Sequence, residues 1–325
     1  MNLDVNLLSI RAISPDRDIP RILSLRHAAE AVDQEGIEIN EQTLRAQLEL
    51  PGHDPLRDRW VIDTPDYHPE DGDPSLIASA LIRQAPGSDE AEAFIVVHPD
   101  WRHQGVGGLL LTRIIGRARQ LDAQSIQVFA NNKHKGAARF LQEHGFVAQG
   151  AYTELRLPAE VRLPPVIWPF GYSMRRYDEV QDISILTQAM NLSYIPLWGH
   201  QEVSEQEMST WLPDFNQQGL FLVFSEKGRV VGISRTEPSP ERSQKNGLPT
   251  GYIDAPGVVP QHRRLDLYRA LVLTGIYWLR DRGLTLVEME SWGDKLEVLK
   301  MYRELGFVDL RQLVSYRLNL TNGVS

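Results

Sequence analysis

A repeat with a period of 161 residues constrains the fold of this chain more than any other feature. Landmarks of the first half return in the second half at this offset, both in a turn and at a later helix end. The pairs are Pro99 with Pro260, Arg102 with Arg263, Gly145 with Gly306, Phe146 with Phe307, and Val147 with Val308. One offset that holds at both places indicates two copies of one structural unit. A length of 325 residues also predicts two domains, because one core rarely serves so long a chain.

The turn around Arg102 carries the strongest chemical signal in the sequence. Residues 91–97 before it are small or β-branched and predict a strand, and apolar residues at 106, 110, 114 and 118 predict a helix after it. Gly105, Gly107 and Gly108 lie where that helix begins. The first N–H groups of a helix lack intrahelical partners, and glycine lets a backbone approach a ligand closely. The turn is therefore suited to bind a phosphate.

Strands and helices alternate in both halves of the sequence. This order predicts an α/β fold with a mixed sheet flanked by helices, built as two tandem domains. Residues 158–171 contain four prolines and predict a semi-rigid linker whose apolar side chains pack along a domain surface. The expected domains are residues 1–157, closed by a strand that begins at Val147, and residues 172–325. In the second domain we expect a helix at Leu265–Arg280 and a capping box formed by Asp294 and Glu297.

The turn and the strand before it resemble the pyrophosphate-binding motif of the GNAT superfamily of acyl-CoA-dependent N-acyltransferases. That motif reads Arg/Gln-x-x-Gly-x-Gly/Ala after a strand ending in Val-x-Pro, and its positions are filled by Val97, Pro99, Arg102, Gly105 and Gly107. Two such units joined by a short linker resemble the mycothiol synthase type of N-acetyltransferase. The resemblance implies an enzyme that uses acetyl-CoA as co-substrate, holds no metal and acts on a small-molecule amine.

The resemblance also implies which residues contact the acyl-CoA. Backbone N–H groups of the splayed strand would polarise the thioester carbonyl, and we expect this contact at Phe94, Ile95, Val96 and Val97. The pyrophosphate would lie against the turn after that strand. The residues expected there are Arg102, His103, Gln104, Gly105, Val106, Gly107 and Gly108, with Asn132 beyond the next strand.

The two copies are chemically unequal at this turn. At the common offset, Gly105 corresponds to Asp266 and Gly107 to Tyr268. A carboxylate a few ångströms from a pyrophosphate costs on the order of 1 kcal/mol in water and several in a drier cleft. The tyrosine adds bulk in the same place. We therefore predict that the first copy binds acyl-CoA and that the second copy does not bind it in the manner of the family.

The catalytic residues are less evident than the binding turn. The family usually places a tyrosine four residues before the Gly-Phe pair, where it protonates the departing thiolate. Tyr302 fills this position in the second copy, whereas Leu141 fills it in the first. In the first copy the proton would come from water, from His134 or from Tyr152. A base should lie near the splayed strand, and Glu92 is the nearest carboxylate, with His98 and Glu35 as further candidates.

Composition narrows the function without naming a substrate. The net charge of −9 argues against a general nucleic-acid binder, and the lack of cysteine excludes disulfides, thiolate metal sites and a cysteine nucleophile. Without a signal pattern or a long apolar run, we expect a cytoplasmic protein with no membrane partner, as a monomer or homodimer. The loop at residues 64–74 carries four carboxylates, which are either solvated or attract a cationic substrate.

Two other functions remain open at this point. One is a non-catalytic acyl-CoA-binding or regulatory protein, which the leucine at position 141 and the lack of an obvious base would suit. The other reverses the roles of the copies, with the C-terminal copy active through Tyr302.

Overall fold

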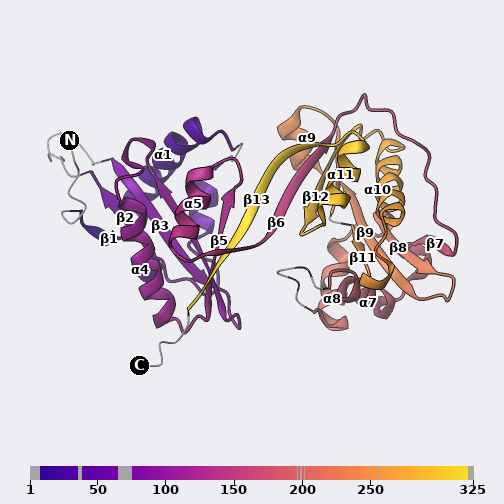
Figure 1. Cartoon of the computed structure of the whole chain (residues 1–325), viewed down its shortest axis with the longest axis horizontal. Coiled ribbons are helices and arrows are strands. Elements are labelled where there is room, and N and C mark those ends of the chain that lie inside the picture. Colours follow the sequence, from indigo (N-terminus) through magenta and orange to yellow (C-terminus); the bar gives the residue numbers. More distant parts are fainter. Residues whose placement is uncertain are drawn as a thin grey trace. The chain divides into compact units, whose positions relative to one another are not determined.

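The computed structural model describes residues 8–35, 39–64, 75–195, 197, 200, 202–254 and 256–320. It is a mixed α/β structure that divides into two compact units (Figure 1). Unit 1 comprises Met1–Gln149 together with Val314–Ser325, and unit 2 comprises Gly150–Leu313. The predicted fold class, a mixed sheet flanked by helices in two tandem units, is confirmed.

Unit 1 contains a mixed sheet in the order β1-β2-β3-β4-β5-β13. The first four strands are antiparallel neighbours, and β4 runs parallel to β5. Its elements are β1 (Ile10–Ala12), α1 (Pro15–Asp33), α2 (Glu41–Ala46), α3 (Pro55–Asp58), β2 (Arg59–Asp63), β3 (Leu76–Gln84), β4 (Glu90–Val97), α4 (Val106–Gln120), β5 (Ser125–Asn131) and α5 (Lys135–Glu143), with the start of β6 (Val147–Leu157) and the end of β13 (Val308–Asn319).

Helices cover both faces of the sheet in unit 1. Because side chains alternate along a strand, Val96 of β4 packs with Ile19, Ile22 and Leu25 of α1, whereas its neighbours face the opposite side. On that opposite side, residues 91, 93, 95 and 97 of β4 pack in a cluster with the apolar face of α4. The predicted amphipathic helix after the turn is confirmed.

Unit 2 repeats this arrangement with the strand order β7-β8-β9-β10-β12-β6-β13. A helix, α9, is inserted between β9 and β10, and a short strand, β11, pairs with β9. Its own elements are β7 (Tyr172–Arg176), α6 (Tyr177–Val180), α7 (Ile183–Ser193), α8 (Glu205–Trp211), β8 (Leu220–Ser225), β9 (Val230–Pro238), α9 (Pro240–Asn246), β10 (Thr250–Ile253), β11 (Gly257–Val258), α10 (Leu265–Arg280), β12 (Leu286–Trp292) and α11 (Leu296–Glu304).

The two units exchange their final strands. From Tyr152 to Leu157, β6 pairs antiparallel with β12, so Leu155 and Leu157 lie in the core of unit 2. The last part of β13 belongs to unit 1, where Tyr316 and Leu320 are buried in the core and the Leu320 N–H donates to the carbonyl of Gln124. The boundaries of the two units therefore differ from those of the expected domains, 1–157 and 172–325. The reason is that strand partners are set by non-local packing.

The proline-rich segment at 158–171 packs along unit 2, as predicted, although its apolar residues Ile167 and Phe170 are exposed. Val161, Leu163, Val166 and Trp168 lie against the unit 2 core. Two residues of α10 tie down its backbone: Arg280 Nη1 donates to the Val161 carbonyl at 2.9 Å, and the Tyr277 hydroxyl donates to the carbonyls of residues 163 and 164.

Of the predictions made for single elements, one is confirmed, one is wrong and one falls largely outside the described residues. The helix at Leu265–Arg280 has the expected bounds. The capping box of Asp294 and Glu297 is wrong, because Lys295 occupies the N-cap of α11 and Asp294 instead accepts from the Ser291 hydroxyl at 2.7 Å. The acidic loop predicted at 64–74 lies almost wholly outside the described residues.

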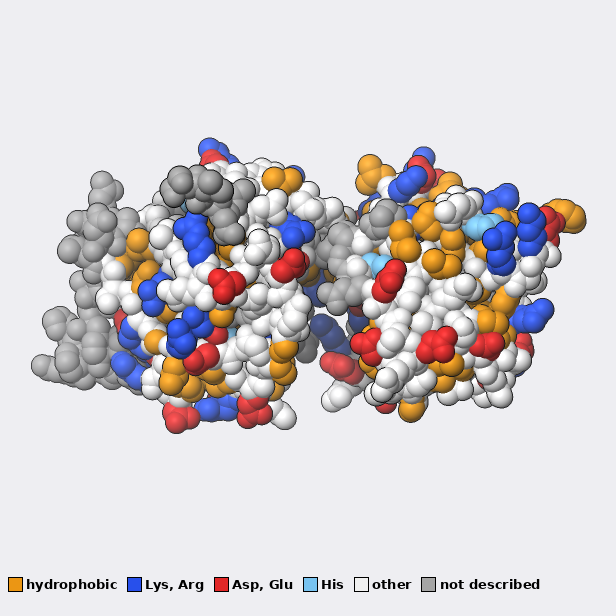
Figure 2. Space-filling model, turned by 90° about the horizontal axis from the view of Figure 1, so that it is seen from below, with side chains coloured by type: hydrophobic (Ala, Val, Ile, Leu, Met, Phe, Trp, Pro, Cys, Tyr) orange, Lys and Arg blue, Asp and Glu red, His pale blue; other side chains and the backbone are white. Residues whose placement is uncertain are grey.

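Among the described helices, none combines the length and apolar character needed to cross a membrane. Acidic, basic and apolar side chains are all visible on each unit in Figure 2.

Candidate active site

A divergence of β4 from β5 forms the centre of the site in unit 1. The two parallel strands pair only at their beginnings, where Glu90, Ala91 and Glu92 lie opposite residues 125–127. Beyond that point β4 pairs with β3 alone, as far as Val97. The edge of β4 that faces β5 is therefore unpaired over residues 93–97, as the expected splay requires.

The register of β4 shows which amides face this gap. The His98 N–H donates to the Ile77 carbonyl of β3, so every second residue before it also bonds to β3. The N–H groups of Ile95 and Val97 accordingly face the gap, whereas those of Phe94 and Val96 face β3. Of the four expected contacts on this strand, two thus have their amides available.

The turn that follows β4 presents a row of free amides. A short 3-10 helix, Pro99–Trp101, leads to Arg102, and α4 begins at Val106 with Gly105 as its N-cap. His103 has a φ of 61° and Gly105 a φ of 84°, so the backbone is left-handed at both positions. In the described part of the chain, the N–H groups of residues 103 to 107 have no acceptor. At the positive end of a helix dipole, such amides suit an anion.

Small residues keep this anion-binding turn open. A Cβ at Gly107 would lie 3.4 Å from the Phe140 ring of α5, which is tighter than most such contacts. A side chain at Gly105 would be strained, because L residues rarely adopt a φ of 84°. The backbone from His103 to Gly107 thus leaves its amides accessible to an anion.

Arg102 does not point freely at this turn. Its guanidinium forms two hydrogen bonds with the carboxylate of Asp33, each 2.7 Å long, and its Nε donates to the Val97 carbonyl at 3.1 Å. The hydrogen bonds with Asp33 raise the pKa of Arg102 above its ordinary value. The sequence suggested that Arg102 contacts phosphate directly, whereas the structure makes it a brace between α1 and the end of β4.

Two further candidate residues gather beside this brace. His134, which precedes α5, has its Nε2 2.9 Å from Oε1 of Glu35 and its Nδ1 3.9 Å from Oδ1 of Asp33. The guanidinium of Arg26, from α1, lies 4.7 Å from the centre of the Phe94 ring. Glu35 and His134, which the sequence offered as a base and a proton donor, therefore stand together next to the turn.

The other candidates of unit 1 stand apart from this cluster. Glu92 lies in the paired part of β4, roughly 16 Å along the strand from Val97, and its exposed carboxylate pairs with Arg83 at 2.9 Å. It is poorly placed to act as the base. Nδ1 of His98 accepts from the Asp100 N–H at 3.4 Å. Asn132 is exposed in the turn after β5, and Leu141 is buried.

The equivalent turn of unit 2 is shorter and has a carboxylate of the protein at the start of its helix; we call this turn closed. Helix α10 begins at Leu265, two residues earlier in the repeat than α4, so fewer residues separate it from Arg263. The N–H groups of Leu267 and Tyr268 are bonded to the Arg264 carbonyl. Asp266 lies in the first helical turn and forms two 2.6 Å bonds with the Arg264 guanidinium. The protein's own carboxylate therefore stands at this helix end, and Tyr268 is buried.

Tyr302 lies in the core of unit 2. Its side chain is fully buried, and its hydroxyl has no hydrogen-bond partner among the described residues. Burial raises its pKa well above the ordinary value for tyrosine, and the nearby Asp294 carboxylate acts in the same direction. Tyr302 thus occupies the family position of the acid, within the unit whose turn is closed.

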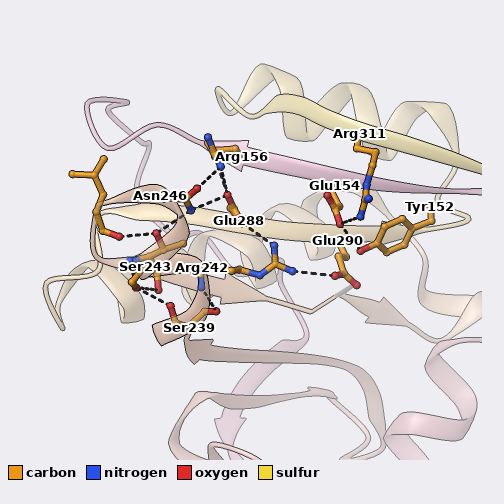
Figure 3. A network of polar contacts seen from close by, with 12 residues as sticks. Tyr152, Glu154, Arg156, Ser239, Arg242, Ser243, Asn246, Glu288, Glu290 and Arg311 are labelled. Carbon is orange, nitrogen blue, oxygen red and sulfur yellow. Dashed lines mark hydrogen bonds and ion pairs between the residues drawn. The ribbon is translucent and has the colours of Figure 1, made fainter. Parts of the chain in front are cut away.

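A polar network covers part of the sheet in unit 2 (Figure 3). Glu288 of β12 accepts from Arg156 of β6 and from Arg242 of α9, at 2.5 and 2.7 Å. Glu154 accepts from Arg311 at 2.6 Å and from the Tyr152 hydroxyl at 3.1 Å. Tyr152, a second proton donor suggested by the sequence, belongs to this network of unit 2. Within the described ranges, no cluster of residues could hold a metal ion.

Asp33 is the residue of the site that sequence reasoning missed. It lies 69 positions from Arg102, at the last residue of α1, and nothing in its local pattern distinguishes it from a solvated helix end. The only available signal was its presence beside Glu35, which the sequence did offer as a base.

Comparison with known proteins agrees with this geometry. Residues 33–146 and 183–307 each match the model of the acetyltransferase (GNAT) family. The mycothiol acetyltransferase of Rhodococcus jostii (strain RHA1) is 28% identical over 249 residues, which cover 74% of this chain and 79% of the relative.

Two solved structures share the fold over nearly the whole chain. A GCN5-related N-acetyltransferase from Sphaerobacter thermophilus has a TM-score of 0.66 at 19% identity, covering 96% of this chain and 95% of that one. A tandem GNAT protein from the clavulanic acid biosynthesis pathway has a TM-score of 0.57 at 17% identity, covering 96% and 98%. Because the family model matches both repeats and most of the residues, this chain belongs to the acetyltransferase (GNAT) family and is a tandem N-acetyltransferase.

Proposed function

We propose that the protein transfers an acetyl group from acetyl-CoA to a small-molecule amine, and that unit 1 binds the acetyl-CoA. The observation that carries this proposal is the row of free amides from His103 to Gly107, directly after a strand whose edge is unpaired. The name of the Rhodococcus relative, mycothiol acetyltransferase, supports an acetyl donor and a small acceptor.

We assign separate roles in binding and in catalysis to the residues of unit 1. Amides 103–107 would hold the diphosphate, with Gln104 contributing backbone only, whereas the Gly108 N–H is bonded to the Gly105 carbonyl. The N–H groups of Ile95 and Val97 face the gap and would stabilise charge on the thioester oxygen. Acetyl-CoA itself supplies an acyl group that is activated as a thioester.

Proton transfer is assigned to the pair of Glu35 and His134. An amine must lose a proton to attack, and Glu35 and His134, with Oε1 and Nε2 2.9 Å apart, are both groups that can accept one. The same pair offers a route for protonating the thiolate, since Leu141 cannot. Glu92 is set aside because Arg83 engages it in the paired part of β4.

A matched pair of variants tests the assignment to unit 1. Arg102 and Arg263 both donate from Nε to the carbonyl of the last residue of their strand, at 3.1 and 2.9 Å. Calorimetry with CoA should show that Arg102→Ala weakens binding by about tenfold, because the anion-binding turn loses the positive charge beside it. Arg263→Ala should leave the affinity unchanged. The reverse pattern would assign the CoA to unit 2.

The reverse arrangement, with unit 2 catalytic through Tyr302, is the second candidate. The unpartnered hydroxyl of Tyr302 favours it, because a buried donor without an acceptor calls for an explanation. The closed turn at Asp266 weighs against it. A thiol-release assay of Tyr302→Phe with acetyl-CoA and a panel of amines separates the two candidates.

A further inference from the structure

We propose that Asp33 is a positioning residue for acyl transfer, which fixes the His134 ring beside the end of β4. This inference rests on the proposed function of unit 1. Asp33 is the last residue of α1, and its carboxylate is bound on one side by both terminal nitrogens of Arg102. Its Oδ1, which accepts from Arg102 Nη1, also lies 3.9 Å from Nδ1 of His134.

The brace formed by Arg102 links two elements of unit 1. Arg102 joins α1, through Asp33, to the Val97 carbonyl at the end of β4. Side-chain exposure is 19% for Asp33 and 30% for Arg102, so the pair is shielded from much of the solvent. A bidentate contact between a guanidinium and a carboxylate fixes orientation as well as distance.

Unit 2 shows that the brace alone does not need a carboxylate. Arg263 makes the same contact with the carbonyl of its strand, that of Val258. Its guanidinium then reaches the backbone carbonyls of Ser193 and Ile195, at the end of α7. The residue at the repeat position of Asp33 is Tyr194, because 33 + 161 = 194. The arginine of the closed unit thus contacts backbone carbonyls where Arg102 contacts a carboxylate.

The carboxylate of Asp33 therefore has a purpose that the closed unit lacks. In unit 1 the neighbour is His134, whose ring is flanked by Asp33 at Nδ1 and by Glu35 at Nε2. Neither contact is a hydrogen bond among the described residues, so the two carboxylates act on the orientation of the ring through their charge. At the repeat position of His134, unit 2 has Lys295, which needs no such orientation.

A carboxylate beside an anion-binding turn also opposes the anion. Removing its charge should therefore leave the affinity for CoA unchanged or slightly higher, whereas turnover should fall because His134 is no longer held. A residue with only a structural role would lower affinity, turnover and thermal stability together. The separation of these quantities distinguishes a positioning role from a structural one.

The test compares Asp33→Asn with Asp16→Asn. Asp16 is an exposed carboxylate on the same helix, with only a 3.4 Å contact to Arg45, so it controls for the charge change. Thiol release from acetyl-CoA gives kcat, with an amine panel and with water as the acceptor, and calorimetry gives the Kd for CoA. We expect kcat to fall about tenfold in Asp33→Asn, with Kd no more than twofold weaker, and no change in Asp16→Asn.

A double variant shows whether Asp33 acts through His134, and CoA binding by the wild type tests the proposed function separately. In His134→Ala, the Asp33→Asn substitution should have no further effect on kcat, because residues that act together are not additive. If Asp33→Asn turns over like the wild type, or loses affinity and kcat in parallel, the inference is wrong while the proposed function stands. If the wild-type protein does not bind CoA, the proposed function and the inference both fail.

Discussion

The turns that follow Pro99 and Pro260 begin alike and end differently. Each starts with a short 3-10 helix, and each has an arginine whose Nε holds the carbonyl at the end of the preceding strand. In unit 1 the next amides are free, whereas in unit 2 the helix begins earlier and Asp266 stands at its end. We therefore propose that the shared arginine preserves the scaffold, and that the residues at the glycine positions determine whether an anion can bind.

The largest expected effect concerns whether either unit exists alone. A fragment of residues 1–157 lacks the end of β13, and with it the buried side chains of Tyr316 and Leu320. It also leaves Leu155 and Leu157 without the unit 2 core. We expect it to show no cooperative thermal transition by circular dichroism. Joining residues 314–325 to Gln149 through a flexible linker should restore one. A fragment 1–157 that melts like the full chain would refute the strand exchange.

The next largest effect is expected when Gly105 of unit 1 is replaced by aspartate, the residue that unit 2 has at the repeat position. Gly105→Asp places a carboxylate at the helix end and forces a side chain into a φ of 84°. We expect the affinity for CoA, measured by calorimetry, to fall at least about a hundredfold, because strain and charge repulsion add. Gly87→Asp is the matched control, since Gly87 has a φ of 79° with open space around it. Equal losses in both variants would show that strain alone is responsible.

A smaller effect is expected from the pH dependence of unit 2. Burial raises the pKa of Asp294 to about 6, from an ordinary value of 3.8. A raised pKa means that the folded state disfavours the ionised form, so the contribution of Asp294 to stability is present below pH 4 and is lost as the pH rises through 6. Asn at this position does not titrate.

Denaturant unfolding at several pH values checks this expectation. The stability of Asp294→Asn relative to the wild type should increase between pH 4 and pH 7.5 by on the order of 2 kcal/mol. A difference that is constant across this range would show that Asp294 is not perturbed in the folded protein.

The smallest effect is expected at Tyr302. Its hydroxyl is buried and unpaired, so Tyr302→Phe should raise the free energy of unfolding by about 1 kcal/mol. Transfer activity should stay within about twofold of the wild type. Loss of activity by two orders of magnitude would instead show that unit 2 carries out the reaction.

The sequence predicted the parts of the molecule that depend on local pattern. The offset of 161 placed both turns and both helix ends, and the glycines at 145 and 306 do adopt positive φ values. It also indicated the chemical difference at the turn, because the substitutions of Gly105 and Gly107 are visible without a structure.

What the sequence could not predict depends on contacts between distant residues. A strand such as β13 shows its alternation but not its partner, so its return to unit 1 was not foreseen. The engagement of Arg102 by Asp33 joins residues 69 positions apart. Asp294 had the pattern of a helix cap, yet it accepts a hydrogen bond from Ser291 instead.

The most direct test of the central claim is a structure of the protein with CoA bound. We predict a diphosphate against the amides of His103 to Gly107 in unit 1, and none against Arg264 and Asp266 in unit 2. CoA held only in unit 2, with the turn of unit 1 empty at saturating ligand, would contradict it.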